Sequence, residues 1–374
     1  MNEYIVNFGE TFYFIARKFN FETKELLAAN PGITNPDLVI PGQIIYIPTK
    51  QAIKKTISVN GFTLPNINTQ KLSEILPYLT YLSILGYRSD LDGTLSNIED
   101  GPLIQFARSA SVAPMMVIAN IDENGTYSAE LAHSILSDPQ IQNNLITNVV
   151  NVLNDKHYYG LNIDFDYLYP ADLSLFLNFV NVFGGILRQQ GYFLQLSGRF
   201  STFPQIDEFT QSNTHDNVNQ FIIMPNEFSY SLGQILVMAP LDQLQRVLDA
   251  VETVPRSKIL LGIPNGAFDW VSPSPLGTPG QPVLKDHVIK LYKDVGAIYQ
   301  YDAITRGGTF NYIDNLGNGH IVWVEGGHGF DFYLQLIGIY NLNGASLWTI
   351  DAYTLSDYQI LAALYEIRKV IDVL

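Results

Sequence analysis

Eight short apolar runs, most of them followed by a stretch with helical periodicity, constrain the fold of this chain more than any other feature. The runs have strand-like length and composition, and apolar residues recur at helical spacing between them, for example over 129–136 and 241–251. Strands that alternate with helices build parallel sheets, so eight of them predict an α/β protein with a closed (β/α)8 barrel, the TIM-barrel architecture. The predicted strands are residues 56–64, 81–87, 114–120, 160–166, 193–199, 220–225, 258–264 and 345–349.

The interval between the last two predicted strands, from Asn265 to Gly344, is too long for a single helix. Three short segments in it have the composition of hairpin strands: residues 299–301, 311–313 and 321–324. We therefore expect a small α+β region, at about residues 275–335, inserted in a barrel domain that spans residues 56–374.

The fourth run carries acidic residues on an otherwise apolar strand. The apolar residues Leu161, Ile163 and Phe165 alternate with the polar residues Asn162, Asp164 and Asp166. Side chains alternate between the faces of a strand, so the polar group shares one face. Acidic side chains at the carboxyl end of a barrel strand are typical of catalytic residues. The alternative is a loop that caps the next helix, which explains Asp172 better than it explains Asp164 and Asp166.

Residues 1–49 have a separate pattern of strand, helix, helix and strand. The segments that define it are Tyr4-Ile5-Val6, Gly9-Glu10-Thr11-Phe12, Ile15-Ala16, Asn30-Pro31 and Ile40-Pro41-Gly42-Gln43-Ile44-Ile45-Tyr46-Ile47-Pro48. This set resembles a LysM module, a small βααβ domain. Residues 50–55 form a short polar linker to the barrel.

The LysM resemblance implies binding to glycans that contain N-acetylglucosamine, such as peptidoglycan or chitin. In that family the sugar lies between the loop after the first strand and the loop after the second helix. The residues that the resemblance places at the glycan are Gly9, Glu10, Thr11, Phe12, Asn30, Pro31 and Ile33. The alternative is a small domain that tethers a protein partner.

The acidic strand resembles the DGxDxDxE motif of glycoside hydrolase family 18, aligned over residues 160–166. Further matches are Asn60-Gly61-Phe62, Leu79-Thr80-Tyr81-Leu82-Ser83-Ile84, Asp92-Gly93-Thr94-Leu95, Gly262-Ile263-Pro264-Asn265, Asp269-Trp270, Val322-Trp323-Val324-Glu325 and Ser346-Leu347-Trp348. Together they resemble the LysM-linked spore-cortex and peptidoglycan glucosaminidases of spore-forming bacteria.

Family 18 enzymes use the substrate's own acetamido oxygen as nucleophile, an exception to the usual scheme with two carboxylates. The resemblance implies that Asp166 is the general acid and that Asp164 orients the acetamido group. The family's acid is Glu, so Asp166 is shorter by one methylene. On the sixth strand, Asn226 replaces the Tyr that binds the acetamido carbonyl, and its amide can still donate a hydrogen bond.

Other residues at predicted strand ends are candidate sugar ligands. Trp348 matches the aromatic floor that family 18 places under the sugar, and a buried core Trp is the alternative. Asn162 replaces the first Asp of the motif. The predicted substrate-binding residues are Trp348, Glu227, Tyr87, Asn120, Asn265 and Asn162. For the Tyr and Asn residues at strand ends, a turn or a loop hydrogen bond is the alternative.

The composition limits the classes of function. The chain of 374 residues has 36 acidic and 21 basic side chains, a formal net charge of −15, which opposes binding to nucleic acid. It has no cysteine, and its six histidines show no metal-binding spacing, so we expect neither a metal nor a cofactor. We find no apolar run of about 18 residues for a membrane span and no secretory signal pattern at the N-terminus.

Two functions therefore remain open. The first is a glycosidase, of the N-acetylglucosaminidase or chitinase type, that acts on spore cortex peptidoglycan or its fragments by retaining hydrolysis, with Asp166 lowering its rate. The second is a catalytically inactive glycan-binding protein of the spore coat or cortex. For both functions, the resemblance implies a protein that is made in the mother-cell cytoplasm and deposited at the spore coat or cortex. Spore coat proteins are then candidate further partners. The alternative is a protein that stays in the cytoplasm.

Overall fold

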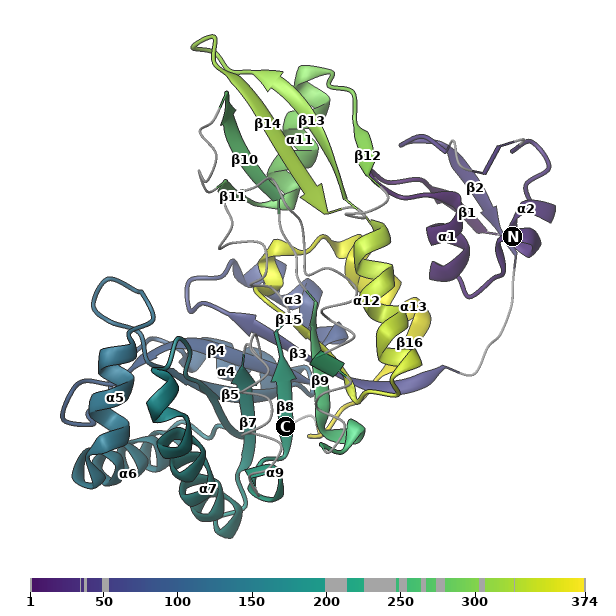
Figure 1. The fold of residues 1–374 in the computed structure, drawn as a ribbon. Helices are drawn as coiled ribbons and strands as arrows, with labels where there is room; N and C mark the ends of the chain where they lie inside the picture. The colour runs from purple at the N-terminus through teal and green to yellow at the C-terminus, as the bar shows by residue number, and fades with distance from the viewer. Residues whose placement is uncertain are drawn as a thin grey trace.

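The computed structural model describes residues 2–33, 35–36, 39–48, 54–198, 214–224, 247–248, 254–263, 267–273, 280–302, 307–325 and 327–372. Within these ranges the chain forms a barrel, a five-stranded sheet inserted between two of the barrel strands, and a small N-terminal unit (Figure 1).

The barrel is a closed ring of eight parallel strands, as the sequence predicts. Its strands are β3 (Lys55–Thr63), β4 (Tyr81–Arg88), β5 (Ala113–Ala119), β6 (Gly160–Asp164), β7 (Phe193–Gly198), β8 (Gln220–Ile223), β9 (Ile259–Ile263) and β15 (Gly344–Leu347). Each strand pairs with its neighbour in the chain, and β15 closes the ring by pairing with both β9 and β3. A short strand, β16 (Tyr365–Ile367), pairs in parallel with the start of β3.

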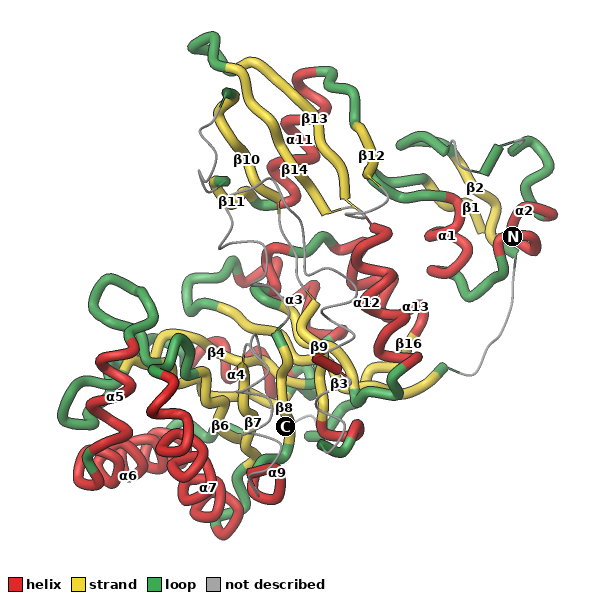
Figure 2. The backbone as a smooth tube through the Cα atoms, in the orientation of Figure 1, coloured by secondary structure: helices red, strands yellow, loops and turns green. Residues whose placement is uncertain are grey.

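Helices surround the strands on the outside of the barrel (Figure 2). They are α3 (Thr69–Ile75), α4 (Gly101–Ser109), α5 (Ala129–Ser137), α6 (Pro139–Asp155), α7 (Leu173–Gln189), α9 (Thr214–Asn217), α12 (Gly327–Ile339) and α13 (Leu355–Leu364). The 3-10 helices are η1 (Leu76–Tyr78), η2 (Pro170–Asp172), η3 (Arg256–Lys258) and η4 (Ile350–Ala352). Side-chain caps begin several of these helices: Ser128 accepts a hydrogen bond from the backbone of Leu131 in α5, and Asp138 caps α6 in the same way.

Among the described helices, the segment Pro170–Gln189, which contains α7, is long and apolar enough to cross a membrane by length and composition. In this fold α7 instead covers the barrel. The ring of Phe165 stacks on those of Phe176 and Phe179 at centroid distances of 5.9 and 6.1 Å. The buried face of α7 therefore completes the core of the barrel.

The interior of the barrel is layered. Its middle layer is polar and buried, and consists of Asn60, Ser83, Asn162, Gln195, Gln220 and Ser346. These side chains satisfy one another, for example through Ser83 Oγ to Asn60 Oδ1 at 2.7 Å and Gln195 Nε2 to Gln220 Oε1 at 3.0 Å. Above it, towards the carboxyl ends of the strands, lies an apolar layer of Phe62, Leu85, Val117, Ile222 and Leu260, packed against Met224 and Trp348.

The N-terminal unit consists of β1 (Asn2–Ile5), α1 (Phe12–Lys18), α2 (Thr23–Ala28) and β2 (Ile44–Ile47), with the two strands antiparallel. It packs closely on the rest of the chain, because α1 contacts α12 and α13 of the barrel. Phe8 inserts its ring between those of Tyr292 and Tyr299 in the inserted region, at 4.4 and 4.9 Å. A cavity of about 580 Å³ remains where the N-terminal unit, the inserted region and α13 meet.

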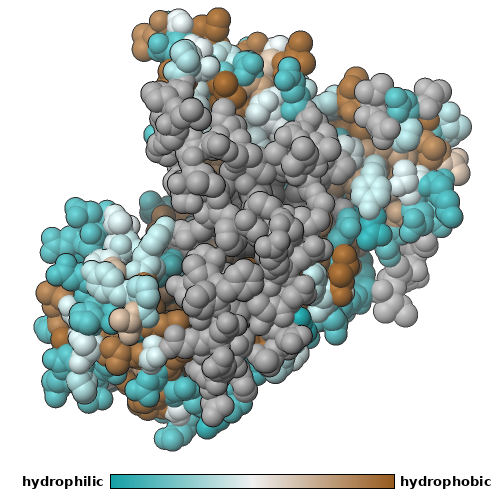
Figure 3. Space-filling view, in the orientation of Figure 1, coloured by the Kyte–Doolittle hydropathy of each residue, from teal (hydrophilic) through white to brown (hydrophobic). Residues whose placement is uncertain are grey.

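The inserted region is an antiparallel sheet covered on one face by the helix α11 (Lys285–Val295). Its strands, in spatial order, are β11 (Gln281–Val283), β10 (Ala267–Ser272), β14 (Gly319–Glu325), β13 (Gly307–Ile313) and β12 (Gln300–Asp302). The sheet thus begins at Ala267, before the expected start near residue 275. Hydrophobic side chains are visible at its outer end (Figure 3), where Val271, Ile313 and Leu316 are exposed.

Gly160 allows the close approach of β6 and β7, which yields a test of the barrel. A Cβ at Gly160 would lie 2.0 Å from the carbonyl oxygen of Phe193, whereas a Cβ at Gly185 of α7 would meet nothing within 4 Å. We expect Gly160→Ala to lower the free energy of unfolding by about 1–3 kcal/mol, because backbone atoms would have to move. Gly185→Ala is the matched control and should raise stability by up to about 1 kcal/mol through helix propensity. Urea denaturation measures both; equal stability of the two variants would contradict this packing.

Candidate active site

Asp164 is the last residue of β6 and lies at the mouth of the barrel. Its side chain is largely buried, with a residue exposure of 7%. The hydroxyl of Tyr127 donates a hydrogen bond of 2.5 Å to its Oδ2 atom. Tyr127 comes from the loop after β5, where it forms an isolated antiparallel bridge with Ile121. The carboxylate is thus held by the loop that follows the neighbouring barrel strand, β5.

Asp166 follows the end of β6, and its backbone is fixed by Asn120. The side-chain oxygen of Asn120 accepts a hydrogen bond from the Asp166 N–H, and its amide nitrogen donates to the Asp166 carbonyl, both at 2.8 Å. Phe165, directly after β6, packs outward onto Phe176 of α7. The backbone of Tyr167, in the left-handed region at φ 52°, donates to Asp166 Oδ1 at 2.8 Å.

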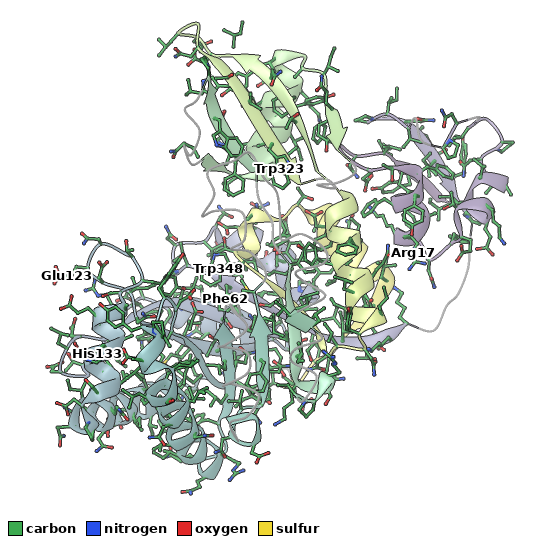
Figure 4. All side chains as sticks on the ribbon, viewed as in Figure 1. Arg17, Phe62, Glu123, His133, Trp323 and Trp348 are labelled. Atoms are coloured by element: carbon green, nitrogen blue, oxygen red, sulfur yellow. The ribbon has the colours of Figure 1, made fainter. Side chains whose placement is uncertain are left out.

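Trp348 lies across the mouth from this acidic strand. In the closed ring, β6 and β15 are opposite one another, because β3, β4 and β5 separate them on one side and β7, β8 and β9 on the other. Trp348 follows β15 and is partly buried, with its ring 4.7 Å from that of Phe62 (Figure 4). The barrel mouth therefore has Asp164 on one side and the ring of Trp348 on the other, and an aromatic face can stack on a pyranose ring.

Two tyrosines, Tyr127 and Tyr167, lie next to Asp164 and Asp166 in the structure. Tyr167 is 57% exposed, and its ring lies 6.0 Å from that of Tyr127. Sequence reasoning missed Tyr127, although one signal was available. Tyr127 directly precedes Ser128, the residue that caps α5. It therefore lies in the loop between a barrel strand and the next helix, and these loops line the carboxyl-end mouth of a barrel.

The structure corrects the prediction that Tyr87 is a sugar ligand. Its side chain is buried on the outside of the barrel, where its hydroxyl donates to Asp100 Oδ2 at 2.5 Å. Tyr158 donates to the same oxygen, and Lys156 bonds to the other oxygen of Asp100 at 2.7 Å. Burial and the hydrogen bond to Asp100 raise the pKa of Tyr87 far above its usual value, so this phenol stays protonated.

The side chains of Asn162 and Asn120 likewise make hydrogen bonds to other groups of the protein. Asn162 belongs to the buried middle layer, where it accepts a hydrogen bond from Ser197 Oγ at 3.0 Å. Asn120 is fully buried, and its amide nitrogen is shared between the carbonyls of Asp166 and Ser128. Neither side chain reaches a sugar at the mouth; their roles are to support β6 and to fix Asp166. The predicted residues Asn226, Glu227 and Asn265 lie outside the described residues.

The alternative interpretation of the acidic strand concerned Asp172, which does precede α7. Its carboxylate makes no capping hydrogen bond, however. It contacts His133 Nδ1 instead, with both oxygens at 2.9 Å. Within the described ranges, no three His, Asp or Glu side chains gather closely enough to hold a metal ion.

In the N-terminal unit, three of the predicted glycan-binding residues are buried and support the fold of the unit. Phe12 is fully buried in the core. Asn30 is 4% exposed and bridges both backbone groups of Tyr46, accepting from its N–H at 2.7 Å and donating to its carbonyl at 2.8 Å. Glu10 is 7% exposed and accepts hydrogen bonds from Tyr4 and from the backbone of Asn7.

Four predicted residues remain accessible to a glycan: Gly9, Thr11, Pro31 and Ile33. Thr11 also caps α1 by accepting a hydrogen bond from the backbone of Phe14 at 3.2 Å. The predicted glycan-binding set is thus accessible only in part.

Comparison with known proteins agrees with this architecture. Residues 4–48 match the model of the LysM domain family. The chain is 28% identical to the cortical fragment-lytic enzyme of Bacillus subtilis over 433 residues, covering 99% of each protein. The crystal structure of the Bacillus cereus spore cortex-lytic enzyme SleL superposes with a TM-score of 0.79 at 25% identity, covering 99% of this chain and 88% of that one. A chitinase from Chromobacterium violaceum superposes with a TM-score of 0.70 at 25% identity, over 83% of this chain and 98% of that one. The resemblance found in the sequence is confirmed.

Glu10 provides a test of whether its role is structural. Its carboxylate lies 3.5 Å from Lys18 Nζ, and both side chains are almost completely buried. We expect Glu10→Gln to lower the free energy of unfolding by about 3 kcal/mol, since it leaves the Lys18 ammonium buried without a counter-charge. The double variant Glu10→Gln/Lys18→Met should recover much of that loss.

The matched control for this test is Glu3→Gln, on the exposed side of β1, which should change little. Thermal unfolding measures stability, and co-sedimentation with insoluble peptidoglycan measures binding. Unchanged stability of Glu10→Gln together with lost sedimentation would show instead that Glu10 is a glycan ligand.

Proposed function

We propose that this chain, whose residues 4–48 form a LysM domain, is a glycosidase that cleaves polymers containing N-acetylglucosamine, in particular spore cortex peptidoglycan or its fragments. The observation that carries the proposal is the position of Asp164 and Asp166 at the end of β6, across the barrel mouth from Trp348. Similarity along the whole chain to a cortical fragment-lytic enzyme supports this substrate class.

In the first step, Asp166 as a carboxylic acid gives its proton to the glycosidic oxygen while the bond from that oxygen to the anomeric carbon breaks. The acetamido oxygen of the same sugar forms the new bond to the anomeric carbon, which yields a cyclic oxazolinium ion. Asp164 accepts a hydrogen bond from the acetamido N–H and stabilises the positive charge. Trp348 lies under the sugar ring.

In the second step, a water molecule attacks the anomeric carbon and gives a proton to the Asp166 carboxylate. The bond to the acetamido oxygen breaks, so the acetamido group is regenerated and the sugar keeps its original configuration. Each carboxyl group thus returns to its starting state. The two hydrogen bonds between the Asn120 side chain and the Asp166 backbone hold Asp166 in place through both steps.

The length of Asp166 yields a quantitative test. Lengthening the side chain by one methylene, as in Asp166→Glu, brings the acid closer to the glycosidic oxygen, and misplacement by about 1 Å costs about a hundredfold in rate. We expect Asp166→Glu to raise kcat about 10- to 100-fold, and Asp164→Asn to abolish turnover. Release of reducing ends from purified muropeptides measures both.

Asp155→Glu is the matched control, since Asp155 ends α6 on the exposed surface and should not affect turnover. Hydrolysis that survives Asp164→Asn and Asp166→Asn would show that the acids of β6 are not the catalytic groups.

A second candidate function is glycan binding without turnover, and the short acid at position 166 favours it. In that case the wild type would sediment with insoluble peptidoglycan and release no reducing ends. Activity gained by Asp166→Glu alone would identify the missing methylene as the cause and show that Asn226 is tolerated.

We further propose that the chain is divided into a glycan-binding module (1–49), a linker (50–55) and a catalytic barrel (56–374) with its inserted sheet. Similarity to the cortical fragment-lytic enzyme supports a location at the spore cortex, and we propose the spore coat as part of the same region. Coat proteins are proposed as additional partners.

A further inference from the structure

The loop between β5 and α5 has a defined shape that delivers Tyr127 to Asp164. Asp122 Oδ1 accepts hydrogen bonds from the backbone N–H groups of Asn124 and Thr126, both at 2.9 Å. The Asp122 N–H donates to the carbonyl of Thr126 at 2.8 Å, and Gly125 takes the left-handed conformation, at φ 80°, that closes the turn. These bonds make the loop a hairpin rather than an open connection.

The end of this loop is joined to the residue that fixes Asp166. The Ser128 N–H donates to the carbonyl of Asn120 at 2.8 Å, and the Asn120 amide donates back to the Ser128 carbonyl at 2.9 Å. One loop therefore holds both acids of β6: Asn120, before it, holds the Asp166 backbone, and Tyr127 holds the Asp164 carboxylate.

The contact between Tyr127 and Asp164 is suited to a positioning role. A phenol hydroxyl that donates to a carboxylate at 2.5 Å makes a short, charge-assisted hydrogen bond. Tyr127 is not a core residue, because its side chain is only partly buried and lies beside the exposed ring of Tyr167. Its hydroxyl is directed at the largely buried carboxylate of Asp164.

We propose that Tyr127 is a positioning residue for Asp164, and that its ring, together with that of Tyr167, forms a side wall of the subsite for the acetamido sugar. The phenol holds Oδ2 of Asp164 and so fixes the orientation of the carboxylate that accepts the hydrogen bond from the acetamido N–H. A carboxylate fixed in one orientation before the substrate binds loses no rotational freedom during the reaction. This inference rests on the proposed hydrolysis.

The decisive variant is Tyr127→Phe, which keeps the ring and removes only the hydroxyl. We expect kcat on muropeptides to fall about 10- to 100-fold, with KM changed less than about threefold, because the lost bond acts on Asp164 and not on sugar affinity. Thermal stability should stay near that of the wild type. The matched control is Tyr169→Phe, since Tyr169 is 48% exposed, and its ring lies 6.1 Å from that of His133. An unchanged kcat in Tyr127→Phe would overturn the proposal.

A second measurement separates this proposal from the proposed function. N-acetylglucosamine thiazoline has the cyclic shape of the oxazolinium ion, so its affinity reports on the orientation of Asp164 without any turnover. Calorimetry should show at least tenfold weaker binding to Tyr127→Phe than to the wild type and to Tyr169→Phe. If neither the wild type nor Asp166→Glu hydrolyses muropeptides, the proposed function fails, and this difference in affinity still supports the role of Tyr127. Equal affinities, or no binding to the wild type, would overturn it.

Discussion

Pairing between β15 and β3 closes the barrel, and the geometry of the candidate site depends on this closure. Gly344 at the start of β15 has no room for a side chain, because a Cβ there would lie 1.7 Å from the carbonyl oxygen of Ser58. Once the ring is closed, the carboxyl ends of all eight strands meet at one rim. Closure therefore places Trp348 opposite Asp164, although the two residues are 184 positions apart in the chain (348 − 164).

The acids of β6 are held by side chains of the neighbouring strand and its loop. Asn120 fixes the backbone of Asp166, and Tyr127 fixes the carboxylate of Asp164. Hydrogen bonds of this kind hold reacting groups in one orientation, which is what a preorganised site requires. The N-terminal unit packs against the other two parts of the chain. Phe8 contacts the inserted region, and α1 contacts the barrel helices α12 and α13. The residues that match the LysM model are thus held in a fixed relation to the barrel.

The sequence predicted all eight barrel strands, because periods of two and 3.6 residues are local properties. The prediction that Tyr87 binds the sugar was wrong for a physical reason. Ser83 and Leu85 face the interior, so simple alternation places Tyr87 there as well. The register of β4 shifts between Ile84 and Tyr87, where Gly86 has a φ of 128°, and the irregularity turns Tyr87 outward. Asn162 does face the interior, but it lies one layer below the mouth, and depth within a barrel is not visible in alternation.

What the sequence determined by itself was the order of strands and helices, the shared face of Asn162, Asp164 and Asp166, and the LysM pattern of the first residues. These follow from spacing between near neighbours in the chain. Only the tertiary structure decided which polar groups are already satisfied and which reach the mouth. That outcome depends on hydrogen bonds between segments far apart in sequence, such as Tyr127 with Asp164, and on the depth at which each strand enters the closed ring.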